Sequence, residues 1–160
     1  MKQFNALPAT EAEDRLYACL PNRRWAAALV NARPYRDLDQ VLDAADLGAR
    51  RLGDAEWAEA IAAHPRIGEG GGHAPQASAR EQSRAQRASR ETLDALSAEN
   101  RWYENRFGHV FLIAASGRSG EEILVELRRR MNNDAATELD ETKRELRQIV
   151  RLRLGKMLSA

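Results

Sequence analysis

Apolar residues recur every three or four positions along most of the chain, a spacing typical of amphipathic helices. The longest such pattern predicts one helix from Asn133 to Leu158, with an inward stripe formed by Leu146, Ile149, Val150 and Met157. The same periodicity predicts further helices over about 10–20, 22–33, 37–48, 54–64, 77–96, 98–107 and from 119 onward.

Local signals indicate where these helices begin and end. Thr10-Glu11-Ala12-Glu13 and Ser119-Gly120-Glu121-Glu122 have the form of a capping box. Asn22 and Asp37 are predicted to cap their helices, and Asn132 or Asn133 the last one. Gly48 and Gly108 are expected to end the helices before them.

Only the segment His109–Ala114 has the composition of a strand. No internal repeat or linker separates two cores. The sequence therefore predicts an all-α fold, with residues 1–160 forming a single-domain helical bundle of about seven to nine helices.

Composition narrows the class of protein. The chain has 160 residues, few aromatic side chains and a net charge of +1, which argues against a dedicated nucleic-acid surface. No stretch is long and apolar enough to cross a bilayer, and the first residues carry no apolar signal core. With Cys19 as its only cysteine, the protein is expected to be soluble and cytoplasmic.

Arg153 lies at the centre of the apolar stripe of the last predicted helix, whereas Arg147 and Arg151 fall on the opposite side. A guanidinium does not lose its proton, so burying it without a partner is very costly. Either a carboxylate of the fold or a bound substrate should therefore meet Arg153.

His64 is predicted to face inward, because it follows Trp57 and Ile61 at helical spacing and precedes Pro65. One interpretation is a core histidine that is hydrogen-bonded to a carbonyl. The other is a proton carrier facing a cavity, since histidine has an ordinary pKa of about 6.5.

Ser78, Glu81 and Gln82 form a second candidate cluster. Ser78 and Glu81 could make only a capping box. However, Glu81 shares a helix face with small residues such as Ala85 and Ala88, which leave room for another molecule, and Gln82 lies at the margin of that face.

The glycine-rich stretch from Pro65 to Gln76 allows weaker interpretations. It lacks the strand and the Gly-Lys-Ser/Thr ending of a phosphate-binding loop. His64, Glu69 and His73 match no recognised metal-site spacing, so no metal is expected, and mobility near an active site is favoured. The run Arg128-Arg129-Arg130 is interpreted as a solvated helix end.

Taken in order, four motifs resemble those of 2-oxo-4-hydroxy-4-carboxy-5-ureidoimidazoline (OHCU) decarboxylases. They are His64-Pro65-Arg66-Ile67-Gly68, Ser78-x-x-Glu81-Gln82, Phe107-Gly108-x-x-Phe111-Leu112-Ile113 and Leu152-Arg153-Leu154. Similarity at Phe4-Asn5-x-Leu7-Pro8, Arg24-Trp25-Ala26 and Arg33-Pro34 extends the resemblance over almost the whole chain. One departure is Val110, where many relatives have proline.

This resemblance implies an all-helical enzyme that decarboxylates OHCU to (S)-allantoin, the last step from urate to allantoin, without a cofactor. It implies catalytic roles for His64, Glu81 and Arg153, with Arg153 preferred over Arg151 on helical phase. The substrate-binding residues that it implies are Pro65, Ser78, Gln82, Phe111, Leu112 and Ile113. The family also suggests a homodimer acting on a small molecule, with no nucleic-acid or membrane partner.

Two other classes of function stay open at this point. A helical protein-interaction module would use its inward polar residues only for structure. A nucleic-acid-binding helical domain is disfavoured by the near-zero net charge and the scarcity of aromatic residues.

Overall fold

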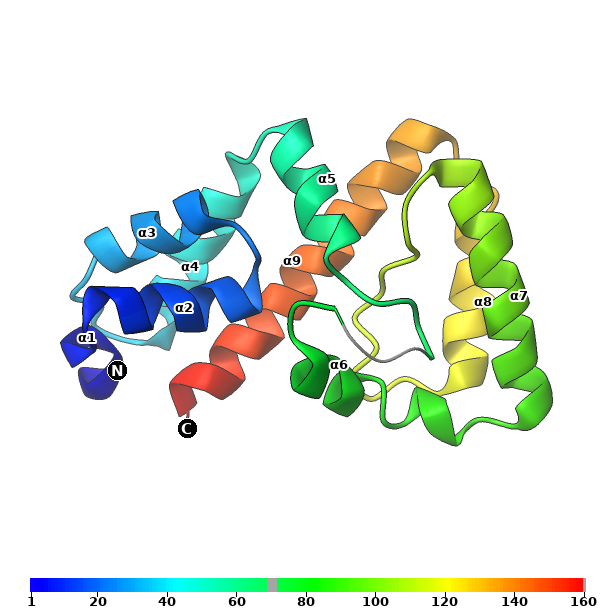
Figure 1. Cartoon of the computed structure of the whole chain (residues 1–160), viewed down its shortest axis with the longest axis horizontal. Helices are drawn as coiled ribbons and strands as arrows, with labels where there is room; N and C mark the ends of the chain where they lie inside the picture. The colour runs from blue at the N-terminus through cyan, green and yellow to red at the C-terminus, as the bar shows by residue number, and fades with distance from the viewer. Residues whose placement is uncertain (69–71, 160) are drawn as a thin grey trace. The chain divides into compact units, whose positions relative to one another are not determined.

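The computed structural model describes residues 1–68 and 72–159, and all of the regular structure within them is helical. The α-helices are α1 (Lys2–Ala6), α2 (Ala9–Cys19), α3 (Arg23–Asn31), α4 (Leu38–Arg50), α5 (Asp54–Ala62), α6 (Pro75–Glu81), α7 (Arg90–Phe107), α8 (Gly120–Arg130) and α9 (Ala135–Ser159) (Figure 1). A short 3₁₀ turn, Ala85–Arg87, lies between α6 and α7. The prediction of an all-α fold is confirmed. Among the described residues, no helix is both long and apolar enough to cross a membrane.

The chain divides into two compact units. The first contains residues 1–60 and the C-terminal part of α9 from Arg147 onward, and the second contains residues 61–146. In the first unit α3 packs against both α2 and α4. The Trp25 indole N–H donates to the Ala45 carbonyl over 3.0 Å, which fixes α3 on α4.

The predictions of helix caps in the first unit are partly confirmed. The side chains of Asn22 and Asp37 accept hydrogen bonds from the backbone of Trp25 and Gln40, as predicted. The capping box at Thr10 is wrong, because α2 already begins at Ala9 and Thr10 lies inside its first turn.

The predicted helix end at Gly48 is also wrong, since α4 continues to Arg50. A Cβ atom at Gly48 would lie 3.1 Å from Cδ1 of the Trp25 ring. The glycine therefore provides space for the buried indole within the helix and does not terminate it.

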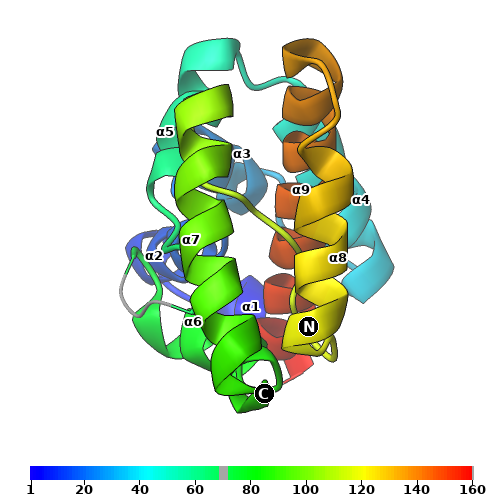
Figure 2. The ribbon, with the colours of Figure 1, turned by 90° about the vertical axis from the view of Figure 1, so that its right-hand side faces the viewer.

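The second unit is built on α7 and α8, which lie side by side (Figure 2). The segment between them, predicted as strand-like, is extended but belongs to no strand of the described structure. Phe111, Ile113 and Ala115 from this segment pack in one core with Leu96 of α7 and Leu127 of α8. The apolar run therefore reflects a chain that passes through the core.

The predicted division into helices 77–96 and 98–107 is wrong. The α-helix is interrupted between Glu81 and Arg90, and α7 then runs without interruption to Phe107. Ser89 caps α7 by accepting from the Thr92 backbone N–H, and Gly108 ends it in the left-handed conformation, as predicted. The break lies where the chain passes closely over α8: a Cβ at Gly120 would be 2.5 Å from Cβ of Ala88.

The starts of the last two helices differ in how well the sequence predicted them. The capping box at α8 is confirmed, since Ser119 and Glu122 exchange side-chain-to-backbone hydrogen bonds. The predicted cap of α9 at Asn132 or Asn133 is wrong. Asp134 takes this position, and its carboxylate accepts from the Thr137 backbone N–H over 2.8 Å.

Candidate active site

His64 lies immediately beyond α5 and is buried. Its ring meets the ring of His73 edge-on, with the two centroids 4.6 Å apart. The His73 backbone N–H donates to the Ala63 carbonyl, and a Cβ at Gly72 would lie 2.6 Å from the Pro65 ring. The stretches on either side of the glycine-rich loop are therefore packed together tightly around His64.

Ser78, Glu81 and Gln82 are all buried, Ser78 and Glu81 within α6 and Gln82 at its C-cap. The interpretation of Ser78 as a helix cap is wrong, because α6 begins at Pro75 and Ser78 lies in its interior. The inward-facing polar cluster predicted from helical phase is thus present. A carboxylate, a hydroxyl and an amide lie near one another on this short helix.

Gln82 connects α6 to the segment that follows His64. Its side-chain oxygen accepts a hydrogen bond from the backbone N–H of Gly68 over 2.8 Å. Two motifs separated in the sequence, His64–Gly68 and Ser78–Gln82, are therefore joined directly in the second unit.

Phe111, Leu112 and Ile113 are buried in the same unit, and their backbone is held from two directions. The Leu112 carbonyl accepts from Arg130, over 2.7 Å. The neighbouring Ala114 N–H donates to the carboxylate of Glu145, also over 2.7 Å. The segment thus has a defined position although it has no secondary structure.

Arg153 is 5% exposed and lies in the part of α9 that belongs to the first unit, whereas Arg151 is exposed. The prediction from helical phase that Arg153, and not Arg151, faces inward is confirmed.

The alternative metal site cannot be assembled from the described residues. Glu69 lies outside them, together with Gly70 and Gly71 of the predicted loop. Among residues 1–68 and 72–159, no group of three histidine, cysteine or acidic side chains is arranged to hold a metal ion.

A sequence model of the OHCU decarboxylase family matches residues 5–155 of the chain. The protein belongs to the OHCU decarboxylase family. The OHCU decarboxylase of Haloferax volcanii is 26% identical over the full chain and 96% of its own length. The "Uric acid degradation bifunctional protein TTL" of Arabidopsis thaliana is 30% identical over 92% of this chain, which spans 47% of that longer protein.

Among solved structures, OHCU decarboxylase crystallised in the presence of (S)-allantoin is similar, with a TM-score of 0.81 and 29% identity. The match covers 92% of this chain and 99% of that one.

The interpretation of Arg130 as part of a solvated helix end is wrong, because its side chain is buried and only 1% exposed. Its Nε and Nη2 donate to Glu138, Nη2 also donates to Thr142, and the guanidinium lies over the Phe111 ring. The helical phase carried a usable signal, because Arg130 follows Ile123 and Leu127 on the inward face of α8.

The electrostatics of this cluster keep Arg130 charged. Burial alone would lower the pKa of its guanidinium, but the hydrogen bonds and charge of Glu138 outweigh that effect and raise it. Tyr103 donates its hydroxyl to the same carboxylate. Its own pKa is raised, first by burial and then by the bond to Glu138. The Arg130–Glu138 ion pair, together with the neutral groups bonded to it, therefore holds α8, α9 and the Phe111–Ile113 segment together within this unit.

Proposed function

We propose that this protein decarboxylates OHCU to (S)-allantoin without a cofactor, as the last step of urate-to-allantoin conversion. The observation that carries the proposal is the buried polar cluster of the second unit, in which Gln82 joins the His64 and Glu81 motifs in a chain of this family. We further propose that residues 1–160 act as one domain in the cytoplasm, as a homodimer without nucleic-acid or membrane partners.

The substrate contains its own electron sink. Its carboxylate is attached to the carbon that bears the hydroxyl, next to a ring C=N bond. When the C–C bond to the carboxylate breaks, carbon dioxide leaves and the electron pair moves toward the imine. This chemistry explains why neither an organic cofactor nor a metal is required.

His64 and Glu81 are proposed as the groups that move protons. Together they would take the hydroxyl proton as the C–C bond breaks and direct protonation of the resulting enediamine-like intermediate to one face. The hydroxyl carbon becomes the carbonyl of allantoin, and the neighbouring carbon receives the new hydrogen. The former imine nitrogen, which took up the electron pair of the broken C–C bond, is protonated as well. Because both groups are buried, the proton is delivered away from bulk water, which favours a single enantiomer.

The remaining site residues are proposed to bind and orient. Ser78 and Gln82 would hold the ring and ureido groups, and Pro65 would shape the turn that aims His64. Arg153 would bind a ring or ureido oxygen and stabilise the charge that develops there. The backbone of Phe111, Leu112 and Ile113 would contact the ring.

The test is to supply freshly generated OHCU and follow the chirality of allantoin by circular dichroism. The wild-type protein should give (S)-allantoin faster than the spontaneous reaction, which gives both enantiomers. His64→Ala and Glu81→Ala should each lower the rate by about 10²–10⁴-fold, and Arg153→Ala should also lower it severely.

Matched controls separate chemistry from folding. His109→Ala, Glu91→Ala and Arg151→Ala remove the same kinds of side chain outside the proposed site and should retain most of the activity. Full activity in all three site variants would overturn the assignment of His64, Glu81 and Arg153. Production of racemic allantoin by the wild-type protein at the spontaneous rate would overturn the function.

A further inference from the structure

The proposed reaction takes up a proton from water in every turnover. The carbon beside the hydroxyl carbon and the former imine nitrogen each gain a hydrogen, whereas the hydroxyl group of the substrate supplies only one. The substrate enters as a carboxylate and carbon dioxide leaves without a proton, so the other hydrogen comes from outside. The groups proposed to move protons, His64 and Glu81, are both buried. The proton balance therefore requires a route from water to a buried site.

His73 is a titratable residue in contact with His64. The two rings meet edge-on, with their centroids 4.6 Å apart. His64 is 6% exposed, whereas His73 is only partly buried. A histidine ring has an ordinary pKa of about 6.5 and therefore gains and loses a proton readily near neutral pH. His73 thus combines contact with the buried histidine and contact with water.

The backbone on either side of Pro65 determines which nitrogen of His73 titrates. The His73 backbone N–H donates to the Ala63 carbonyl over 3.0 Å, and Nδ1 of the ring lies 3.3 Å from the same oxygen. A carbonyl oxygen can only accept, so Nδ1 carries a hydrogen. Nε2 is then the nitrogen that takes up and releases the second proton. Gly72, at φ +73°, permits this close approach, because a Cβ there would lie 2.6 Å from Cδ of Pro65.

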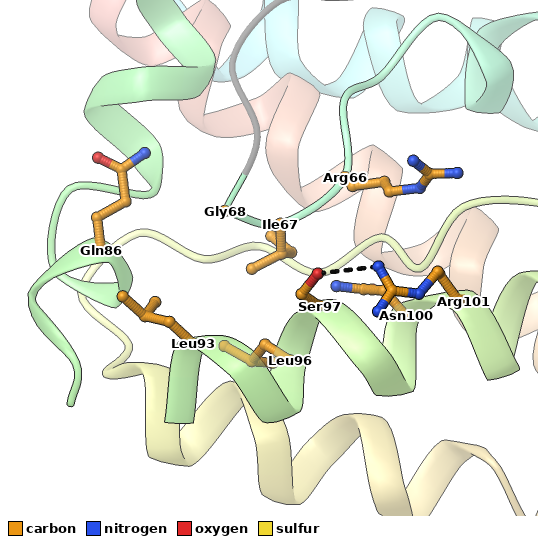
Figure 3. Close-up of a pocket in the computed structure, with 9 residues that line it drawn as sticks. All are labelled: Arg66, Ile67, Gly68, Gln86, Leu93, Leu96, Ser97, Asn100 and Arg101. Carbon is orange, nitrogen blue, oxygen red and sulfur yellow. Dashed lines mark hydrogen bonds between the residues drawn. The ribbon is translucent and has the colours of Figure 1, made fainter. Parts of the chain in front are cut away.

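The segment that follows His64 is anchored on α7. Ile67 packs in one core with Leu96, and both line a cavity of about 170 Å³ (Figure 3). Neither histidine lines this cavity, so it gives water no direct contact with His64. Arg66 is paired with Glu104, and a guanidinium does not release its proton. This side of the site therefore offers no group that could deliver a proton.

We propose that His73 relays the proton that each turnover consumes, from water to His64. The inference rests on the proposed function, because it uses the proton balance of that reaction. After each turnover the His64–Glu81 pair holds one proton fewer than before. His73 takes up a proton at Nε2 and passes it to His64, which leaves hydroxide or the conjugate base of the buffer in solution. Rotation of either ring brings a nitrogen of one to hydrogen-bond distance of the other, and catalytic hydrogen bonds often tighten in this way only in the complex.

A kinetic split identifies the relay. Carbon dioxide has already left when the proton is restored, so this step affects kcat and not kcat/KM. His73→Asn keeps an N–H donor near the position of Nδ1 but cannot carry a proton. In weakly buffered solution it should lower kcat for (S)-allantoin, followed by circular dichroism, about tenfold or more. Its kcat/KM should stay within about twofold of wild type, and the matched control His109→Asn should change neither constant.

Added imidazole distinguishes a proton relay from a structural role. His73→Ala leaves a space in which free imidazole can replace the missing ring, so kcat should rise toward the wild-type value as imidazole is added. The first turnover should be as fast as in wild type, because the resting site still holds its proton. Rapid mixing should therefore show a burst of about one allantoin per chain. An unchanged kcat in weak buffer, a loss that imidazole does not restore, or the absence of a burst overturns the proposal.

A measurement on the wild-type protein keeps the test decisive if the variants fold poorly. Nitrogen NMR of the resting protein should show neutral His73 with its hydrogen on Nδ1, and a hydrogen on Nε2 instead overturns the relay. Failure of the proposed function gives a different result. A wild-type protein that forms (S)-allantoin no faster than the spontaneous reaction rejects the decarboxylase, whereas active His73 variants beside an active wild type reject only the relay.

Discussion

Arg130 and Asn100 are buried polar residues on neighbouring helices of the same unit, yet their surroundings are opposite. All three guanidinium nitrogens of Arg130 donate hydrogen bonds, to Glu138, Thr142 and the Leu112 carbonyl. The amide of Asn100, in contrast, meets no partner among the described residues. The comparison teaches that burial alone does not identify a binding group. A fully bonded charge holds the fold together, whereas an amide buried without a partner lowers the stability of the folded state.

The largest expected effect comes from replacing Arg130, the residue whose guanidinium nitrogens all donate hydrogen bonds. Arg130→Met would leave Glu138 buried without its cation and release the Leu112 carbonyl. We expect a loss of about 3–5 kcal/mol in the free energy of unfolding, measured by urea denaturation.

Two controls accompany this variant. Arg128→Met removes an exposed arginine two positions away and should move the urea midpoint little. The double variant Arg130→Met, Glu138→Leu removes both charges and should recover much of the lost stability, because apolar pairs can replace buried ion pairs. A double variant no more stable than Arg130→Met would contradict this account.

The next largest effect is expected from a substitution at Asn100, whose amide has no partner among the described residues. In Asn100→Asp, burial should raise the pKa of the new carboxyl above its unfolded value. The folded state then favours the protonated form, so stability relative to wild type falls as pH rises from about 4. We expect the variant to be less stable than wild type by about 1–3 kcal/mol at pH 7. Thermal unfolding measured at several pH values between 4 and 8 tests this pH dependence. A deficit independent of pH would indicate that the carboxylate reaches water.

A smaller effect should separate charge from hydrogen-bonding capacity. Glu145→Gln retains an oxygen that can accept from the Ala114 N–H but removes the negative charge. Because hydrogen bonds to charged acceptors are the stronger ones, we expect a loss of about 1 kcal/mol. Chemical denaturation measures it, and a loss as large as that of Arg130→Met would show that the charge of Glu145 is part of the Arg130 network.

The smallest effect concerns the partly exposed Arg66–Glu104 ion pair. Hydrogen bonds from Arg66 lower the pKa of the Glu104 carboxyl. The stabilisation is therefore present above the ordinary value of 4.5 and is lost as pH falls through the lowered pKa. Glu104→Gln should cost about 1 kcal/mol or less at pH 7. The difference from wild type should shrink on acidification, and a difference that grows would reverse the sign assigned here.

The sequence predicted those features that depend on helical phase. Inward positions for His64, Glu81 and Arg153 follow from spacing alone, and the structure buries all three. Arg130 was missed because its neighbours Arg128 and Arg129 made the triplet resemble a charged helix end, although its phase with Leu127 was available.

Other features depend on contacts between distant parts of the chain. The break between α6 and α7 carries no proline or glycine, and it lies where Ala88 comes close to Gly120, a residue distant in the sequence. The unmet amide of Asn100 is also invisible in a sequence, because it depends on what surrounds the side chain in space.

The distribution of tryptophans provides built-in optical reporters. Trp25 and Trp57 are buried in the first unit, whereas Trp102, the third tryptophan of the chain, is 62% exposed on α7 in the second. A water-soluble quencher such as acrylamide should therefore reduce the emission of Trp102 first. Denaturant should change the emission of the other two as the first unit opens. Fluorescence can thus distinguish the surface of one unit from the interior of the other without any attached label.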